Sequence, residues 1–440
     1  MKETVIFLIS FVLLALLSWK FSAGVYQLIG AGDSPEYIFV AESLIQDRDI
    51  FLENQAHKFV IHNLNDKEEV EPYAIRETPP NQLDLNAFYP TNVIPKDGHL
   101  LPYHPIGLSL LIAPAVAILG KWGAMLTINL CAALLALVFY KYTKRFSLAF
   151  LLTFSPPLLY LSLLCFNEIP TALIIFYIFT VIQKECLPQT TKGVITTALG
   201  LGFLPWLHPK YSIISGIFIL YCIYKVQKDN NLSLKKATYK VLKHPITLTS
   251  IFSPILLFCF YQQVYGTWRA ALATGHPGII NPLKGLLGLF LGREYGIILH
   301  APLLLLPLGN ILKNKKVQKK HSPIPPTIIG TFILGISLFG NWHGGVAPAG
   351  RLIAPAIPFL FLYFPSPKTI TNQVVQTLLV IATACLVLTN FATQKTPGVV
   401  LPTGRNHTFQ QLPGGGHLNN ILPSTIDSSG KIKPISLWWE

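Results

Sequence analysis

Two carboxylates stand three residues apart directly after the first long apolar segment of the chain. Residues 31–37 read Ala-Gly-Asp-Ser-Pro-Glu-Tyr, so the acids are Asp33 and Glu36. Ser34-Pro35 is a typical helix start, and the positive end of a helix dipole keeps nearby carboxylates ionised. Ionised acids in this position can remove a proton from a substrate or bind a divalent cation such as magnesium or manganese. The structural alternatives are a helix cap for Asp33 and simple solvation for Glu36.

A third acid and several cations are candidates for the same chemistry. Glu168 lies between two apolar segments, where an ionisable group is a functional candidate, and it could share a metal with Asp33. His104 lies in Tyr-His-Pro-Ile-Gly and could contact a phosphate or donate a proton. Short loops carry further cations suited to a phosphate at headgroup depth, namely His208, Lys210, Arg269, Arg293 and Arg351. Taken singly, each cation is more typical of a structural anchor at a membrane interface, whereas several on one side, facing an acidic loop, favour the functional interpretation.

The composition predicts which elements must position these side chains. Of the 440 residues, 51% are hydrophobic and only 12% are charged, whereas soluble domains carry about 25% charged residues. Many apolar runs reach the ~20 residues needed to cross a bilayer. Backbone polar groups in lipid need internal partners, and the alternation of a membrane barrel is absent, so these runs should be helices. The sequence therefore predicts an all-α polytopic membrane protein.

The net charge of +14 is segregated along the chain. Residues 31–120 carry thirteen acids and five bases, whereas lysines gather between apolar runs at 225–243 and 313–320. Short basic loops stay in the cytoplasm, so this pattern orients a membrane protein. The segregation argues against a nucleic-acid partner and favours contacts between the lysines and membrane lipids.

The positive-inside rule predicts about eleven transmembrane helices in a domain of residues 1–393, with the N-terminus in the cytoplasm. The predicted spans are 4–23, 122–140, 146–165, 169–183, 193–207, 210–226, 246–265, 296–312, 324–340, 351–364 and 372–393. The first could instead be a cleaved signal sequence. An extracytoplasmic loop, 24–121, would carry interfacial helices at about 34–46 and 107–120, and residues 394–440 would form an extracytoplasmic tail. Tryptophan prefers membrane interfaces, and five tryptophans fall at outer ends in this scheme: Trp19, Trp122, Trp206, Trp268 and Trp342.

Four stretches together resemble the GT-C superfamily of glycosyltransferases, which includes protein O-mannosyltransferases, aminoarabinose transferases and oligosaccharyltransferase. Residues 32–37, Gly-Asp-Ser-Pro-Glu-Tyr, are similar to the signature of the family's first loop. Residues 104–107, His-Pro-Ile-Gly, are similar to its His-Pro-Pro segment, and Ser155-Pro156 followed by Glu168 is similar to its second acidic position. Residues 342–355 resemble a late segment of bacterial and archaeal members of unassigned substrate. Many members have Asp-Glu where this chain has Asp-Ser, and the second acid here is glutamate.

The resemblance, which covers about residues 1–365, implies a transferase in a bacterial or archaeal cytoplasmic membrane. Such an enzyme takes a sugar from a polyprenyl-phosphate donor and passes it, with inversion, to an extracytoplasmic lipid, glycan or protein. Asp33 would act as the base or as a metal ligand, and outward cations such as Lys210 or Arg351 would stabilise the leaving phosphate. The partners that the resemblance implies are the lipid-linked donor, the acceptor and membrane lipids. The cofactor that it allows is a divalent cation, magnesium or manganese.

Two other classes of protein stay open on the sequence alone. A transporter or flippase of a lipid-linked or anionic substrate usually has ionisable groups near the bilayer midplane, on broken helices in repeated halves. Here the charges gather at the ends of spans and no internal repeat is evident. The remaining class is a non-catalytic scaffold for envelope assembly.

Overall fold

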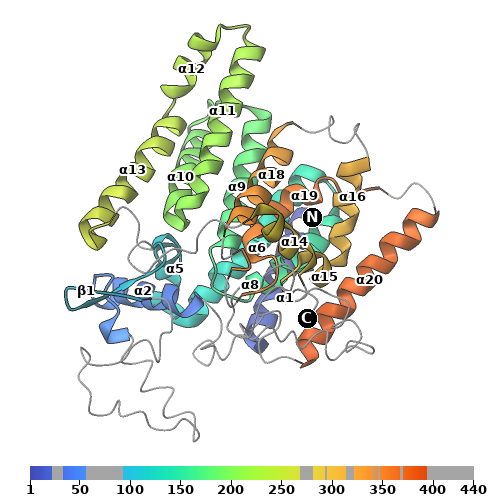
Figure 1. The fold of residues 1–440 in the computed structure, drawn as a ribbon, viewed down its shortest axis with the longest axis horizontal. Helices are drawn as coiled ribbons and strands as arrows, with labels where there is room; N and C mark the ends of the chain where they lie inside the picture. The colour runs from blue at the N-terminus through green and yellow to red at the C-terminus, as the bar shows by residue number, and fades with distance from the viewer. Residues whose placement is uncertain are drawn as a thin grey trace, which may run out of the picture.

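The computed structural model describes residues 1–21, 33–55, 93–267, 281–292, 295–313, 322–339, 342–344, 347–366 and 370–393 (Figure 1). The helices of the first part are α1 (Lys2–Phe21), α2 (Ser34–Gln46), α5 (Gly107–Leu119), α6 (Lys121–Thr143), α7 (Phe146–Phe154), α8 (Leu158–Ser162), α9 (Glu168–Lys184), α10 (Thr191–Leu207), α11 (Ser212–Asp229), α12 (Leu234–Leu242) and α13 (Pro245–Tyr265). The later helices are α14 (Pro282–Leu291), α15 (Ile297–His300), α16 (Leu305–Lys313), α18 (Ile324–Leu338), α19 (Ile357–Phe361) and α20 (Ile370–Thr393). Short 3-10 helices are η2 (Pro209–Tyr211), η4 (Pro302–Leu304) and η5 (Arg351–Ala356). One hairpin, β1 (Val93–Lys96) and β2 (His99–Pro102), completes the described secondary structure, which is otherwise all helical.

Four of the described helices are long and apolar enough to cross a membrane: Lys2–Phe21, Lys121–Thr143, Pro245–Tyr265 and Gln373–Ala392. The prediction of about eleven spans is not confirmed. Predicted span 146–165 is divided into α7 and α8 around Pro156 and Pro157, and span 296–312 is divided into α15, η4 and α16 around Pro302. Span 351–364 is likewise built from η5 and α19. Proline lacks a backbone N–H and clashes with the preceding turn, so it divides runs that hydropathy alone joins.

Helices α1 and α6 lie antiparallel, because contacts join their opposite ends. Glu3 at the start of α1 pairs with Lys141 at 3.3 Å near the end of α6. At the other ends the rings of Trp19 and Trp122 stack with centroids 4.9 Å apart. The N-terminus and the basic turn after α6 therefore share one end of the bundle, as the positive-inside prediction requires.

An aromatic core holds together the helices that carry the candidate site. Phe176 and Phe179 on α9 each lie 5.3 Å, between ring centroids, from Phe359 on α19. Phe139 on α6 contacts Phe176 at 5.4 Å, and all four side chains are fully buried. Such ring pairs add about 0.5–1.5 kcal/mol each to the burial of apolar area. Since α9 begins at Glu168 and η5 leads directly into α19, this packing brings the start of η5 to the start of α9.

The predicted interfacial helices, 34–46 and 107–120, correspond to α2 and α5. Helix α2 is buried on most of its circumference. Phe39 and Val40 pack with Leu52, Leu100 and Ile106 in a second apolar cluster. Neighbouring protein therefore encloses α2, which fixes the orientation of the acidic residues at its start.

The hairpin contributes Leu100 to this cluster, and hydrogen bonds join the hairpin to α13. Its turn, Asp97-Gly98, has φ values of 51° and 83°, and two left-handed residues in succession are typical of the tight turns that match strand twist. Lys96 donates a hydrogen bond to the carbonyl of Val264 at 3.0 Å, and the Tyr265 hydroxyl donates to the carbonyl of Pro102 at 2.9 Å. The end of α13 is thereby held beside the segment that precedes α5.

Replacing Gly123 with alanine should destabilise the protein, because α5 and α6 meet there without room for a side chain. An added Cβ would lie 2.0 Å from the carbonyl oxygen of Ala115. Overpacking against rigid backbone costs about 1–3 kcal/mol or more, which we expect as a lower thermal unfolding midpoint in detergent. Gly335 in α18 is the control, since nothing lies within 4 Å of its added Cβ, and Gly335→Ala should leave the midpoint unchanged or higher. Equal midpoints for the two variants would contradict the close approach of α5 to α6 at Gly123.

Candidate functional site

The guanidinium of Arg351 lies between two buried carboxylates. Its Nη2 donates to Asp33 Oδ2, and its Nε donates to Glu168 Oε1 at 2.9 Å. Nη1 donates to the carbonyl of Gly344 at 3.1 Å. Arg351 is 7% exposed, Asp33 is 8% exposed and Glu168 is fully buried. One cation therefore bridges two acids that lie at the starts of two helices, α2 and α9.

Local structure explains why arginine occupies this position. Arg351 is the first residue of η5, which follows Gly350 in the left-handed region at φ 72°. Its guanidinium lies over the ring of Phe166, 4.1 Å from the centroid. A planar, delocalised guanidinium lies flat on a ring and donates from three separated nitrogens, whereas an ammonium donates from a single nitrogen. The arrangement is thus specific for arginine.

His104 is held between Asp33, the N-cap of α2, and Glu36 in the first turn of that helix. Its Nδ1 lies 2.6 Å from Glu36 Oε2, and its Nε2 lies 3.2 Å from Asp33 Oδ2. The backbone N–H of His104 also donates to Glu36 Oε1 at 2.6 Å. Both ring nitrogens therefore face carboxylates, an arrangement suited to an imidazolium that donates from each side. The residues form one continuous chain of contacts, Glu36–His104–Asp33–Arg351–Glu168, which we call the acidic relay.

Burial and neighbouring charges lower the pKa of Asp33 and raise the pKa values of Glu36 and His104. Burial opposes ionisation of Asp33, but Arg351 and His104 outweigh burial and lower its pKa from the ordinary value. Burial raises the pKa of Glu36 despite the attraction of His104. For His104, burial favours the neutral ring, but Asp33 and Glu36 dominate and raise its pKa. At neutral pH the relay accordingly pairs an ionised Asp33 with a His104 that holds its proton more tightly than a free imidazole.

Replacing His104 with glutamine should remove a pH-dependent contribution to stability. The raised pKa means that folding favours protonated His104, so this contribution is complete below about pH 6.5 and is lost as pH rises through the folded pKa. We expect the variant to be about 1.5–3 kcal/mol less stable at acidic pH. The gap in unfolding midpoint should narrow at alkaline pH.

The matched control for this experiment is His99→Gln. His99 also contacts a carboxylate, that of Glu53 at 3.0 Å, but the two side chains are 51% and 27% exposed. An exposed pair contributes about 0–1 kcal/mol, so its removal should change the midpoint little. A His104→Gln penalty that stays constant across the pH range would contradict the double carboxylate contact.

Asn167 joins the elements around the relay, although its sequence position gave no functional expectation. Its side-chain Nδ2 donates to the Tyr37 hydroxyl at 3.2 Å and to the carbonyl of Leu207 at 3.0 Å. Its Oδ1 accepts from the Tyr211 hydroxyl at 3.3 Å. The available signal was its place at the N-cap of α9, beside Glu168. Asn167 thus connects α2, α9, α10 and η2.

Lys210 is a cation beside the relay that makes no ion pair with any described carboxylate. It is half-buried on η2, and its ammonium lies 5.0 Å from the centroid of the Tyr211 ring. Glu168 Oε2 is buried and has no hydrogen-bond partner among the described residues. The ammonium of Lys210 and the Oε2 atom of Glu168 could therefore each form a further polar contact, with a ligand for example.

The structure brings most of the predicted site residues together. Asp33, Glu36, His104, Glu168 and Arg351 form the relay, and Lys210 lies beside it. His208 caps η2, since its Nδ1 accepts from the backbone N–H of Lys210 at 3.3 Å. Arg269 and Arg293 lie outside the described residues, as does the predicted tail, 394–440.

The predicted metal site at Asp33 and Glu168 does not fit this arrangement. The guanidinium of Arg351 occupies the position between the two carboxylates, so a metal there would have to displace it. Within the described ranges, no group of three His, Cys, Asp or Glu side chains has the geometry to hold a metal ion. We therefore derive no step of the chemistry through a metal.

Comparison with known proteins does not assign this site to a family. No protein-family model matches the chain, and no curated protein matches it.

Proposed function

We propose that the chain is a membrane glycosyltransferase of the GT-C type, which transfers a sugar from a polyprenyl-phosphate donor to an extracytoplasmic acceptor with inversion. The observation that carries this proposal is the pairing of Asp33 and Glu168 through Arg351. These residues come from three of the stretches whose sequences resemble that superfamily. An independent contact among the three supports the resemblance beyond the motifs themselves.

In the proposed reaction, Asp33 accepts the proton of an acceptor hydroxyl while the hydroxyl oxygen attacks the anomeric carbon of the sugar. The bond between that carbon and the phosphate oxygen breaks, and the lipid phosphate leaves with the electron pair. Because the pKa of Asp33 is lowered, it is a weak base, and proton transfer should accompany attack rather than precede it. His104 and Arg351 hold the carboxylate in place.

Lys210 is proposed to bind the phosphate of the donor. Its ammonium is not committed to a described carboxylate, whereas Arg351 is held by two acids. A preorganised cation at the leaving group stabilises the charge that develops there. A half-buried position strengthens this interaction relative to one in open water.

The proposal includes the eleven-span topology, with the relay at the extracytoplasmic end and the N-terminus in the cytoplasm. Support comes from the shared end of Glu3 and Lys141, which is opposite to the end at which Trp19 meets Trp122. Interfacial tryptophans and a basic cytoplasmic turn are the arrangement that the positive-inside rule favours. A bacterial or archaeal cytoplasmic membrane is the proposed location.

The test is the affinity of purified protein for a polyprenyl phosphate. Lys210→Gln should weaken binding about ten- to hundredfold, because a charge-assisted hydrogen bond contributes about 1.5–3 kcal/mol. The control is Lys96→Gln, since Lys96 lies on the hairpin and donates to the carbonyl of Val264. Unchanged affinity in Lys210→Gln would reject the phosphate-binding role.

The same preparation separates a transferase from a transporter or flippase. A transferase in proteoliposomes should release free polyprenyl phosphate from the donor when acceptor is present. A flippase would move the intact donor between leaflets without cleavage. Translocation of uncleaved donor, with no sugar transfer to any extracytoplasmic fraction, would overturn the proposed function.

A further inference from the structure

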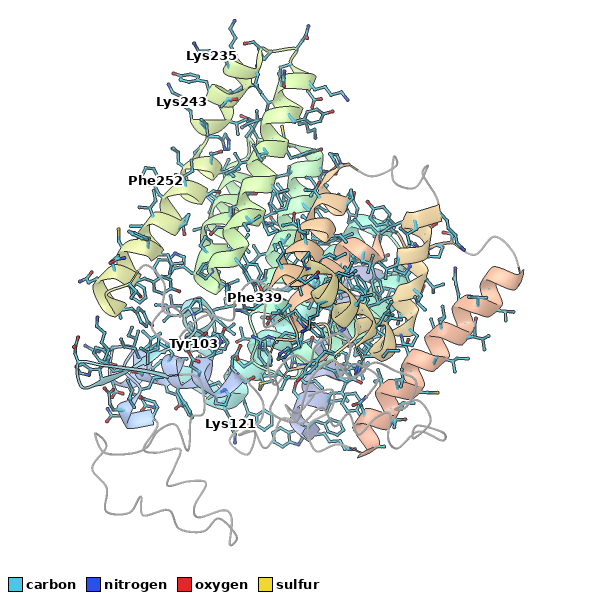
Figure 2. All side chains as sticks on the ribbon, in the orientation of Figure 1. Tyr103, Lys121, Lys235, Lys243, Phe252 and Phe339 are labelled. Carbon is cyan, nitrogen blue, oxygen red and sulfur yellow. The ribbon has the colours of Figure 1, made fainter. Side chains whose placement is uncertain are left out.

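A surface rich in lysine lies on α12, at the opposite end of α13 from the acidic relay. Helix α13 is a candidate membrane span of 21 residues, about 31 Å long. Its last residue, Tyr265, is tied to Pro102 near the relay, whereas its first, Pro245, follows α12. Figure 2 shows Lys235 and Lys243 at one end of α13 and Tyr103 near the other, with Phe252 between them.

Three lysines form a stripe on α12 and at its C-cap. Lys236, Lys240 and Lys243 recur at intervals of four and three residues, so they share one helix face, and all three are exposed. A neighbouring face, with Ala237 and Val241, is buried against the protein. We call the three residues the lysine stripe.

Acids are scarce in the sequence around the lysine stripe. No acid occurs in the sequence between Asn230 and Gln262, and Asp229 is the one acid among six lysines in the segment 225–243. None of the three lysines forms an ion pair with a described carboxylate. The ammonium of Lys243 instead lies 4.2 Å from the centroid of the Tyr239 ring. Among the residues that the structure describes, the stripe is therefore a positive surface with no acid paired to it.

The adjoining surface is apolar and faces outward. Tyr239 is 61% exposed and Leu242 is 40% exposed. Beyond Pro245, α13 exposes large apolar side chains along its length: Leu248, Ile251, Phe252, Ile255, Leu256 and Phe258. A helix that is long enough to span a bilayer and exposes this much apolar surface is expected to contact lipid. The lysine stripe starts where that surface ends, which is the depth of lipid headgroups.

We infer that the lysine stripe binds the headgroups of anionic phospholipids in the leaflet opposite the acidic relay. Charge complementarity and continuity with the apolar face of α13 select a membrane lipid over a soluble partner. Each lysine near a charged membrane surface strengthens binding about fivefold, and the attraction falls with added salt. The inference does not depend on sugar transfer, because it uses residues across the span from the relay.

The test is a lipid titration of the full-length protein followed by native mass spectrometry. The ligands are phosphatidylglycerol and phosphatidylcholine, and the variant is Lys236→Gln with Lys240→Gln and Lys243→Gln. The wild type should bind phosphatidylglycerol at least about tenfold more tightly than phosphatidylcholine. The triple variant should lose this preference while keeping its thermal unfolding midpoint, since the three side chains are exposed.

The control removes three charges elsewhere, by Lys2→Gln with Lys141→Gln and Lys144→Gln, and should retain the preference. Equal loss in the control and in the α12 variant would mean that net charge alone attracts the lipid, and it would overturn the inference. An unchanged preference in the α12 variant would do the same. A wild type that binds a single-stranded oligonucleotide through the stripe, without preferring phosphatidylglycerol, would assign the surface to nucleic acid instead.

Discussion

Asp33→Asn is expected to lower sugar transfer from a polyprenyl-phosphate donor by about a thousandfold, the range in which general bases contribute. Asparagine retains the shape of aspartate and can still accept a hydrogen bond from Arg351, but it cannot take a proton from the acceptor. The donor phosphate is proposed to contact Lys210, which the substitution leaves in place. Donor affinity should therefore change much less than the rate of transfer.

The control for this variant is Asp97→Asn. Asp97 lies in the hairpin turn, and its side chain is 83% exposed, with Lys96 4.0 Å away. Its loss should leave both transfer and the unfolding midpoint unchanged. Transfer by Asp33→Asn within a few fold of the wild type would remove Asp33 from the proposed chemistry.

Arg351→Met is expected to destabilise the protein by about 3–5 kcal/mol, the cost of leaving buried charges without their partner. Both Asp33 and Glu168 lose their guanidinium contact, and Glu168 is fully buried. Arg351→Lys should recover little of this loss, because Asp33, Glu168 and the carbonyl of Gly344 are each contacted by a different nitrogen of the guanidinium, whereas lysine has only one. The measurement is chemical or thermal unfolding of the purified variants.

Arg145→Met is the matched control. Arg145 donates to the carbonyl of Phe364 at 3.1 Å and pairs with no described carboxylate. Loss of one such hydrogen bond costs about 0.5–1.5 kcal/mol. Adding Glu168→Gln to Arg351→Met should recover part of the stability, since it removes one of the stranded charges. Equal penalties for Arg351→Met and Arg145→Met, with no recovery in the double variant, would contradict the bridging role of Arg351.

Local signals in the sequence predict the elements that carry the site. Ser34-Pro35 predicts the start of α2, and the short apolar run before Lys121 predicts α5 as a helix distinct from α6. Asp33, His104 and Glu168 stand out because they are polar residues at the boundaries of apolar segments. For these features, a few neighbouring residues contain the required information.

Contacts between distant residues could not be predicted in the same way. The sequence suggests that Arg351 binds a phosphate, but in the structure two acids from distant segments hold it. The contact of His104 with both Glu36 and Asp33 likewise depends on how α2 packs against the segment before α5. Hydropathy also joins residues 146–165 into one span, although prolines divide the helix there. Tertiary packing determines the contacts of Arg351 and His104, whereas the division of residues 146–165 follows from local prolines that a hydropathy average does not register.

The most direct test of the central claim is an experimental structure of the protein in a lipid bilayer with a bound polyprenyl-phosphate sugar. We predict phosphate within hydrogen-bonding distance of Lys210, with the sugar directed toward Asp33 and the Arg351 bridge intact. A phosphate bound near the bilayer midplane, or at an end of the bundle remote from Asp33, would contradict the account.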